Sequence, residues 1–366
     1  MPLSVVSVIG ARPQFIKASV VSHALRARDG VTEQIIHTGQ HFDANMSKVF
    51  FDELSIPKPD YSLDIHSLPH GAMTGRMLES IEAVLMQAMP DWVVVYGDTN
   101  STLAASLAAS KLHIPVAHIE AGLRSFNRRM PEEINRIVSD HVADLLLVPT
   151  AGAVANLLAE GIAHEKIVEV GDVMYDCAMR FGEIARTRST VLDRLGLSEK
   201  PFILCTAHRA ENTDDPLLLR SLVDALGRLA ADYLVVMPIH PRTRAVANRH
   251  GIDLTLPGLI LTDPVGYLDM VRLEQSSALV LTDSGGVQKE AFFHGVPCVT
   301  IRDQTEWSEL VESGWNVLAP LREGSDALVD IVRARLGTIG TAIEPYGRGD
   351  AASRIVAALE NRARRK

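Results

Sequence analysis

The chain has 366 residues, of which 47% are hydrophobic and 22% are charged, and its formal net charge is -9. A chain of this length exceeds one ordinary core and fits two domains, and its composition is that of a soluble globular protein. The acidic balance argues against nucleic acid or an anionic membrane as the main partner. A locally basic cleft could still bind an anionic small molecule.

Cysteine usage and the first residues of the chain bear on its compartment. The three cysteines, Cys177, Cys205 and Cys298, are widely spaced and predict neither a disulfide framework nor a metal-ligand cluster. A reducing cytoplasm is therefore the expected location. The apolar run Leu3–Ile9 has no cationic segment before it and is followed by Arg12, which indicates a first strand rather than a signal peptide. No stretch reaches the apolar length of a membrane span, so membrane insertion is not expected.

Strand-like and helix-like segments alternate along the chain, which is typical of parallel sheets with crossover helices. The run Leu3–Ile9 begins the first sheet, and the turn Gly10–Pro13 leads into a helix that carries Lys17. Because a helix N-terminus offers free N–H groups to anions, this turn with Arg12 is a candidate phosphate site. Further strands are predicted at Gln34–His37, Trp92–Tyr96, Pro115–Ile119, Leu145–Val148 and Ile167–Val170, for a sheet of about six or seven strands.

The segment after the second predicted strand contains the loop Thr38–His41. We interpret His41 as a hydrogen-bonded loop histidine and Asp43 as the N-cap of the next helix. The proline-containing piece Ile56–Asp64 predicts a surface connection. Core residues of the following helix are indicated by their spacing; they are Met73, Met77, Ile81, Val84 and Leu85.

Two acidic residues follow neighbouring strands. Asp98 comes after Trp92–Tyr96, and Glu120 comes after Pro115–Ile119. In open α/β sheets ligands bind outside the carboxyl ends of the strands, so both carboxylates should face a cleft. Asp98 can equally be the N-cap of the helix Ser101–Lys111, but no helix terminus explains Glu120. The two acids together indicate a functional site.

The segment after Glu120 adds cations and re-enters helix at Pro131. Its arginines indicate an anion site beside the carboxylates; they are Arg124, Arg128, Arg129 and Arg136. Glu132 and Glu133 fall in the first turn of the new helix. We interpret Glu133 as a residue that complements the helix dipole after a proline.

The alternating pattern restarts after a candidate hinge at Gly171–Asp176, with strands predicted at Phe202–Thr206, Tyr233–Ile239 and Ala278–Thr282. The last of these is followed by Asp283, Ser284, Gly285 and Gly286 and by a helix from Val287 to about Phe293. Paired glycines before a helix let the backbone approach a phosphate and donate N–H groups to it. Glu290 could then accept hydrogen bonds from ribose hydroxyls, although an ordinary strand-to-helix turn is the alternative. A final helix is predicted over Asp350–Lys366, with Ile355, Val356 and Leu359 on one face.

Seven ordered motifs resemble those of the non-hydrolysing UDP-N-acetylglucosamine 2-epimerases over nearly the whole chain. They are Gly10–Lys17, Thr38–His41, Gly97–Thr99, His118–Ser125, Pro131–Arg136, Thr206–Asn212 and Asp283–Glu290. The resemblance implies an α/β fold of glycosyltransferase-B architecture: two Rossmann-like domains facing across a cleft, with the C-terminal helix crossing back to the first. It places the N-terminal domain at 1–170, with 350–366 packing on it, and the UDP-binding C-terminal domain at 171–349.

The same resemblance implies an isomerase that interconverts UDP-GlcNAc-type and UDP-ManNAc-type sugars by elimination and re-addition of UDP through a 2-acetamidoglucal. It implies no cofactor and no metal, a UDP-sugar substrate, a cytoplasmic homodimer and a role in polysaccharide synthesis. By the family pattern, Asp98, Glu120 and Glu132 transfer protons, and His208 lies near the leaving phosphate. The nucleotide-sugar site is implied to contain Arg12, Lys17, Arg136, Ser284, Gly285, Gly286 and Glu290.

The chain departs from the family pattern in two places, the second of which concerns activation by an effector. Trp307 stands where many members have an arginine, and the region His66–His70 lacks the Arg-Gln pair of members that a second UDP-N-acetylglucosamine activates. The motifs ARPQFIKA, HGAMTGRMLE and FNRRMPEE resemble the branch that acts on UDP-2,3-diacetamido-2,3-dideoxy-glucuronate. Arg128 and Arg129 could then pair with the sugar carboxylate, or they could belong to a solvated loop. The alternatives are a UDP-sugar glycosyltransferase of the same fold, a hydrolysing epimerase and a non-catalytic nucleotide-sugar-binding protein.

Overall fold

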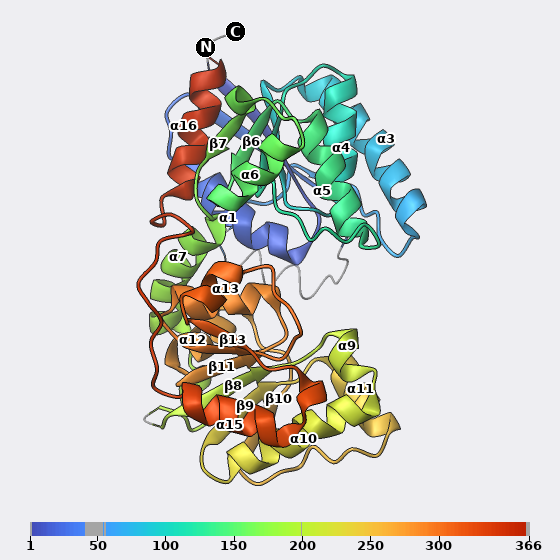
Figure 1. The fold of residues 1–366 in the computed structure, drawn as a ribbon. Helices are drawn as coiled ribbons and strands as arrows, with labels where there is room; N and C mark the ends of the chain where they lie inside the picture. The colour runs from blue at the N-terminus through green and yellow to red at the C-terminus, as the bar shows by residue number, and fades with distance from the viewer. Residues whose placement is uncertain (1, 41–53, 55, 199, 364–366) are drawn as a thin grey trace. The chain divides into compact units, whose positions relative to one another are not determined.

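The computed structural model describes residues 2–40, 54, 56–198 and 200–363, so His41 and Asp43 lie outside the described residues. The chain divides into two compact units (Figure 1). Unit 1 contains Met1–Cys177 and Glu344–Lys366, and unit 2 contains Ala178–Ile343. Each unit has its own parallel sheet with helices on both faces.

Unit 1 has a seven-stranded parallel sheet in the order β3-β2-β1-β4-β5-β6-β7. Its strands are β1 (Leu3–Ile9), β2 (Val31–His37), β3 (Tyr61–Ser62), β4 (Trp92–Tyr96), β5 (Val116–Ile119), β6 (Leu145–Val148) and β7 (Ile167–Glu169). Its helices are α1 (Arg12–Arg26), α3 (His70–Ala88), α4 (Asn100–Lys111), α5 (Pro131–Val142), α6 (Ala151–Ala159), the 3-10 turn η1 (His164–Lys166) and α16 (Ala351–Ala363). The segment predicted as a surface connection, Ile56–Asp64, also contributes the edge strand β3.

The order of the strands reverses between β1 and β4, which lie side by side in the middle of the sheet. Every residue of β4, β5 and β6 is buried, as expected of parallel strands covered by helices on both faces. The carboxyl ends of β1, β4 and β5 therefore meet at one edge, at the point where such sheets bind ligands.

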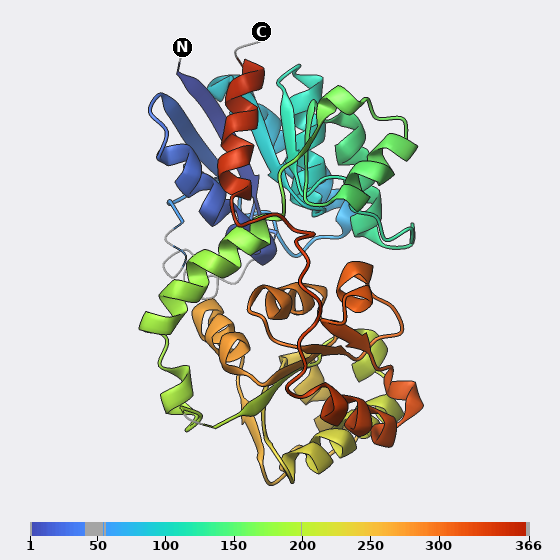
Figure 2. The same cartoon turned by 60° about the vertical axis from the view of Figure 1, so that its left-hand side comes forward.

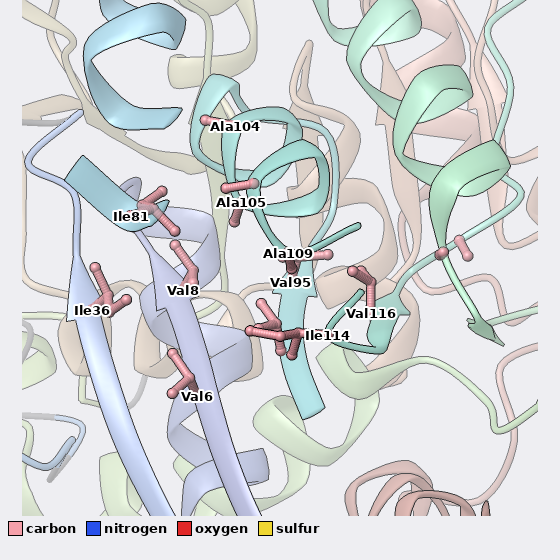
Figure 3. Packing of buried hydrophobic residues seen from close by; sticks show 14 of the residues in the cluster. Val6, Val8, Ile36, Ile81, Val95, Ala104, Ala105, Ala109, Ile114 and Val116 are labelled. Carbon is pink, nitrogen blue, oxygen red and sulfur yellow. The ribbon is translucent and has the colours of Figure 1, made fainter. Parts of the chain in front are cut away.

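One hydrophobic core of unit 1 lies between the sheet and helices α3 and α4. Figure 3 shows apolar side chains of β1, β2 and β4 meeting Ile81 of α3 and three alanines of α4, and all of them are buried. The small residues of α4 allow this helix to pack closely on the strands that precede Asp98. Strand β4, which precedes Asp98, is thus held on a rigid support.

The C-terminal helix α16 packs against α1 in unit 1 (Figures 1 and 2). Its apolar residues Ile355, Val356 and Leu359 are buried, as their spacing predicts. Asp176, in helix α7 (Val173–Arg188), accepts hydrogen bonds from the backbone N–H groups of Ala351 and Ala352 at 3.1 and 2.9 Å. The predicted return of the C-terminal helix to the first domain is confirmed.

Unit 2 repeats the same topology with six parallel strands in the order β10-β9-β8-β11-β12-β13. Its strands are β8 (Phe202–Thr206), β9 (Leu234–Pro238), β10 (Leu259–Thr262), β11 (Leu279–Thr282), β12 (Cys298–Thr300) and β13 (Asn316–Leu318). Its helices are α8 (Val191–Arg194), α9 (Ala210–Thr213), α10 (Pro216–Ala230), α11 (Pro241–Arg249), α12 (Tyr267–Ser276), α13 (Gly285–Phe293), α14 (Ser308–Glu312), η2 (Leu321–Glu323) and α15 (Ser325–Arg335). Here the order reverses between β8 and β11, so the predicted α/β class with two Rossmann-like domains is confirmed.

None of the helices in the described residues combines the length and the apolar composition that crossing a membrane requires.

Candidate active site

In unit 1 the loops that follow β1, β4 and β5 bring four predicted residues together. Glu120 follows β5 and forms an ion pair with Lys17 of α1, and both side chains are nearly buried. Asp98 follows β4 and forms an ion pair with Arg136 of α5. Two carboxylates, each with its own cation, therefore lie at the edge where the strand order reverses.

Glu120 has a backbone φ of 67°, which is uncommon for a residue with a side chain. Strain of this kind clusters at functional sites. A Cβ placed on Gly97 would come within 3.1 Å of the Glu120 Oε2, so Gly97 packs directly against this carboxylate. Burial of Lys17 opposes its charged form, but the charge and hydrogen bond of Glu120, with the charge of Asp98, raise the pKa of Lys17 overall.

Asp98 does not cap helix α4, although the sequence allowed that role. Thr99 is the N-cap, and its hydroxyl accepts a hydrogen bond from the Thr102 N–H at 3.2 Å. The backbone carbonyl of Asp98 accepts a hydrogen bond from Asn135 of α5 at 2.9 Å. With the capping role taken by its neighbour, the Asp98 side chain is available for the pair with Arg136.

The two glutamates at the start of α5 occupy different environments. Glu132 is exposed, whereas Glu133 is only 1% exposed. The Glu133 carboxylate accepts hydrogen bonds from the backbone N–H groups of Ser125 and Phe126 at 2.9 and 2.8 Å and lies 3.3 Å from Arg136. The interpretation of Glu133 as a residue that merely complements the helix dipole is therefore wrong. It fixes the loop after Glu120, including Phe126 at a φ of 57°.

Arg124 does not belong to an anion site. Its guanidinium turns inward and pairs with Asp140 at 2.7 Å and with Glu160 at 2.7 Å. With a side chain only 1% exposed, it cannot reach a ligand, and the expectation for this residue is wrong. Arg128 and Arg129, by contrast, are exposed.

The turn before α1 is also occupied by the protein itself. The backbone N–H groups of Gly10 and Ala11 donate to the side-chain oxygen of Gln14 at 2.8 and 3.0 Å. The Gln14 amide in turn donates to the Tyr96 carbonyl at 2.8 Å. The Gly10 and Ala11 amides are therefore not free to bind a phosphate, although Arg12 begins the helix at the same edge. The sequence interpretation overlooked Gln14, which joins the ends of β1 and β4.

In unit 2 the loops after β8 and β11 surround the buried carboxylate of Asp283. This carboxylate accepts hydrogen bonds from the backbone N–H groups of His208 and Arg209 at 3.0 and 2.9 Å and from the Asn212 side chain at 3.2 Å. The His208 Nδ1 lies 3.3 Å from Asp283, and the His208 side chain is 44% exposed. Asp283 thus holds His208 at the sheet edge with its ring accessible.

The Ser284–Gly286 turn leads directly into α13, whose helix begins at Gly285. The Gly285 carbonyl accepts a hydrogen bond from the Trp307 indole at 2.9 Å, and the Ser284 carbonyl accepts one from Gln288 at 3.3 Å. A Cβ on Gly285 or Gly286 would meet only ordinary contacts at 3.6 Å or more, so packing inside the chain does not require glycine here. Close approach of a ligand to the backbone would require it.

Glu290 lies in the second turn of α13 and is partly buried. Together the unit 2 residues offer a helix N-terminus for a diphosphate and a carboxylate for hydroxyl groups. The unit 1 residues offer paired carboxylates and cations, which suit proton transfer next to an anionic group. Within the described residues no group of three or more histidine, cysteine or acidic side chains is placed to hold a metal ion.

Comparisons with known proteins identify the family that the chain is similar to. The family model described as UDP-N-acetylglucosamine 2-epimerase matches residues 23–360. The UDP-2,3-diacetamido-2,3-dideoxy-D-glucuronate 2-epimerase of Pseudomonas aeruginosa is 57% identical over 96% of this chain and 98% of that relative. The UDP-N-acetylglucosamine 2-epimerase homolog of Methanococcus maripaludis is 46% identical over 98% of this chain and 100% of that relative.

The solved structure of the Methanocaldococcus jannaschii UDP-GlcNAc 2-epimerase, in complex with UDP-GlcNAc and UDP, matches with a TM-score of 0.87 and 41% identity. The match covers 98% of this chain and 100% of that structure. It confirms the predicted glycosyltransferase-B type of fold.

Proposed function

The chain belongs to the UDP-N-acetylglucosamine 2-epimerase family and is a sugar-nucleotide 2-epimerase, and on that premise we propose that its substrate is UDP-2,3-diacetamido-2,3-dideoxy-D-glucuronate. One observation carries the choice of substrate. The Pseudomonas aeruginosa enzyme named for this sugar is 57% identical to the chain, against 46% and 41% for the two relatives named for UDP-N-acetylglucosamine.

The proposed reaction inverts carbon 2 of the sugar in two halves. A base removes the proton from carbon 2, and the bond from carbon 1 to UDP breaks, with its electron pair leaving on UDP. The product is an unsaturated sugar held by the enzyme. UDP then adds back to carbon 1 while carbon 2 takes a proton from its other face. The reaction needs two proton-transfer groups and a group that neutralises the departing UDP.

Unit 1 supplies the proton-transfer groups in this proposal. Asp98, Glu120 and Glu132 are the candidates, and the first two are supported by their shared position at the sheet edge and by their cations. Arg136 and Lys17 keep the charge of each carboxylate balanced, and Arg12 provides a further cation at the start of α1. Gly97 and the strained backbone of Glu120 fix where the second carboxylate points.

Unit 2 supplies the UDP-binding groups. Ser284, Gly285 and Gly286 present the N-terminus of α13 to the diphosphate, where a helix N-terminus favours negative charge. Glu290 accepts hydrogen bonds from the ribose hydroxyls. His208, held by Asp283 with its ring accessible, assists departure of the UDP phosphate.

The additional carboxylate of the proposed substrate calls for cations that unsubstituted UDP-N-acetylglucosamine does not need. Arg128 and Arg129 are proposed for this role because they are exposed on the loop that Glu133 holds in place. Arginine suits a carboxylate because its planar guanidinium can donate two parallel hydrogen bonds. We further propose a cytoplasmic homodimer that serves the synthesis of surface polysaccharide.

The test is proton NMR in heavy water with three UDP sugars: the diacetamido-glucuronate, its analogue without the carboxylate, and UDP-N-acetylglucosamine. We expect deuterium at carbon 2 together with a manno-configured UDP sugar, and the highest rate with the glucuronate. As a control for the chemistry, Glu120→Gln should retain UDP binding and lose about two or more orders of magnitude in turnover, as expected for a lost acid-base group.

Faster turnover of UDP-N-acetylglucosamine than of the glucuronate would overturn the choice of substrate. Transfer of the sugar to an acceptor, without exchange at carbon 2, would indicate a glycosyltransferase. Release of free sugar and UDP would indicate a hydrolysing epimerase.

A further inference from the structure

A buried histidine, His118, connects the elements that carry the proposed catalytic carboxylates. It lies in β5, two residues before Glu120, and its side chain is 0% exposed. Its Nδ1 is 2.7 Å from the Asp140 Oδ1, and its Nε2 is 2.7 Å from the backbone carbonyl of Gly97. One ring thus touches α5 on one side and the end of β4 on the other.

Both partners of His118 are hydrogen-bond acceptors. A carbonyl oxygen has no hydrogen to donate, so the Nε2 must carry one to bond with Gly97. An ionised Asp140 also only accepts, so the Nδ1 must carry a hydrogen as well. With both nitrogens donating, the ring is an imidazolium, and the conclusion depends on Asp140 being ionised.

The surroundings of Asp140 keep it ionised. Burial alone would raise its pKa, but the charge and hydrogen bond of His118 and those of Arg124 lower the pKa of Asp140 below its ordinary value. The contribution of Arg124 does not depend on the protonation of His118. Its Oδ2 accepts a hydrogen bond from the Gly122 N–H at 3.1 Å and lies 2.7 Å from Arg124.

Arg124 also pairs with Glu160, so the group extends beyond Asp140. We refer to His118, Asp140, Arg124 and Glu160 as the unit 1 charged network. The half-exposed His141 lies at its outer end, 3.5 Å from Glu160.

The geometry at Gly97 links this network to the chemistry. Gly97 directly precedes Asp98, and it packs so closely on Glu120 that an added Cβ would lie 3.1 Å from the Glu120 Oε2. Any shift of the Gly97 carbonyl therefore moves Asp98 and the surface against which Glu120 rests. Asp140 meanwhile belongs to the same helix as Glu132 and Arg136.

We propose that His118 is a positioning residue for the epimerisation, an imidazolium whose two hydrogen bonds set the Gly97 turn and thereby the placement of Asp98 and Glu120. This proposal rests on the proposed function, since it assigns these carboxylates to proton transfer. His118 itself does not touch the substrate. A displacement of about 1 Å at reacting groups can lower a rate by about 100-fold, so its contribution should be measurable.

A purely structural role for the same contacts would lower stability and leave the chemistry of the folded enzyme intact. The discriminating variant is His118→Gln, which can hydrogen-bond on one side and cannot carry the charge. The matched control is His141→Gln, the same substitution at the outer end of the network, in α5 next to Asp140. Each folded variant is assayed for the rate of deuterium incorporation at carbon 2, for turnover and for UDP affinity.

We expect His118→Gln to lose about 10- to 100-fold in both rates with UDP affinity unchanged, and His141→Gln to behave as the wild type. Unchanged rates per folded molecule in His118→Gln would overturn the proposal. If wild-type protein shows no exchange with any UDP sugar, the proposed function has failed instead, and the protonation of His118 is still testable.

A second measurement determines the protonation of His118 by NMR. It uses wild-type protein labelled with nitrogen-15 in its histidines, so it does not depend on a variant that folds. Two protonated ring nitrogens at His118 at neutral pH support the proposal, with the resonances assigned through their loss in His118→Gln or by coupling to neighbouring residues. A ring with one bare nitrogen overturns it.

Discussion

Each unit buries a histidine against a carboxylate, and the two pairs are built in opposite ways. In unit 1 the His118–Asp140 contact is 2.7 Å, and both ring nitrogens and both carboxylate oxygens have partners. In unit 2 the closest approach of His294 to Glu274 is 3.9 Å. Among the described residues, the His294 Nε2 and both Glu274 oxygens have no hydrogen-bond partner.

The difference appears in the protonation of the two pairs. Burial and the charge of Glu290 raise the pKa of Glu274 well above its ordinary value. Burial and the charge of Arg186 lower the pKa of His294 to about 4. His294 is therefore neutral at neutral pH, and burial disfavours the charge of Glu274, whereas Asp140 is ionised. A buried charge persists where hydrogen bonds and counter-charges surround it, and otherwise the group becomes neutral.

The largest effect should come from removing a cation of the unit 1 charged network. Arg124→Met fills a similar volume but leaves Asp140 and Glu160 without their guanidinium, so we expect a loss of about 3–5 kcal/mol in unfolding free energy. Urea denaturation, with hydrogen exchange of the β5 amides to report on unit 1, measures it.

The matched control for that variant is Arg228→Met in unit 2. Arg228 pairs with Asp326 on the surface, where the side chains are 45% and 86% exposed. Solvent-exposed pairs contribute less than about 1 kcal/mol, so this variant should unfold close to the wild type. Equal losses in the two variants would show that the unit 1 network is no stronger than a surface pair.

Strand positions in both units could be predicted because the buried strands are short apolar runs bounded by turns. The predicted bounds of Leu3–Ile9, Trp92–Tyr96 and Phe202–Thr206 agree with the structure. The edge strand at Tyr61–Ser62 is too short to carry a periodic pattern. The positions of Asp98 and Glu120 also followed, because a parallel sheet gathers the carboxyl ends of its strands.

The direction of the side chains in the loop after Glu120 could not be predicted from the sequence in the same way. Arg124 is polar and lies in a loop, which favours exposure, yet its partners Asp140 and Glu160 lie far along the chain. One signal was present: Glu133, Arg136 and Asp140 follow each other at spacings of three and four residues, which places them on one face of α5. Charges at this spacing are more typical of a solvated helix face, so the pattern predicted the pairing of charges and not their burial.

An intermediate effect is expected from acid acting on unit 2. Because the pKa of His294 is about 4 in the folded state and about 6.5 when exposed, the unfolded chain takes up a proton first as the pH falls. Unit 2 should therefore lose about 2–3 kcal/mol between pH 6.5 and pH 4 through this residue. His294→Gln should remove that part of the slope in urea denaturation at a series of pH values.

His164 in unit 1 is exposed and offers the comparison for that experiment. His164→Gln makes the same substitution at an exposed position and controls for the change of side chain itself. If the stability of His294→Gln depends on pH as steeply as that of the wild type, His294 is not held neutral by burial.

The smallest effect is expected at Glu274, the carboxyl of the unit 2 pair. Its contribution to stability changes with pH in the opposite direction to that of His294. Unfolded Glu274 ionises above about pH 4.5, while the folded carboxyl stays protonated to higher pH, so the residue lowers stability as the pH rises. Glu274→Gln keeps the shape and removes the ionisation, and should stabilise unit 2 by about 1–2 kcal/mol at slightly alkaline pH and by nothing in acid.

The amide substitution in unit 1 should do the reverse. The pKa of Asp140 is lowered on folding, so its charge adds stability above its ordinary pKa, and Asp140→Asn should destabilise unit 1 at neutral pH. Glu312→Gln, at an exposed position of α14, serves as the neutral reference. A gain from Glu274→Gln that is equal in acid and in base would come from packing rather than ionisation. If Glu274→Gln stabilises the protein and Asp140→Asn destabilises it, the two buried carboxyls differ because of their partners, since both are equally removed from water.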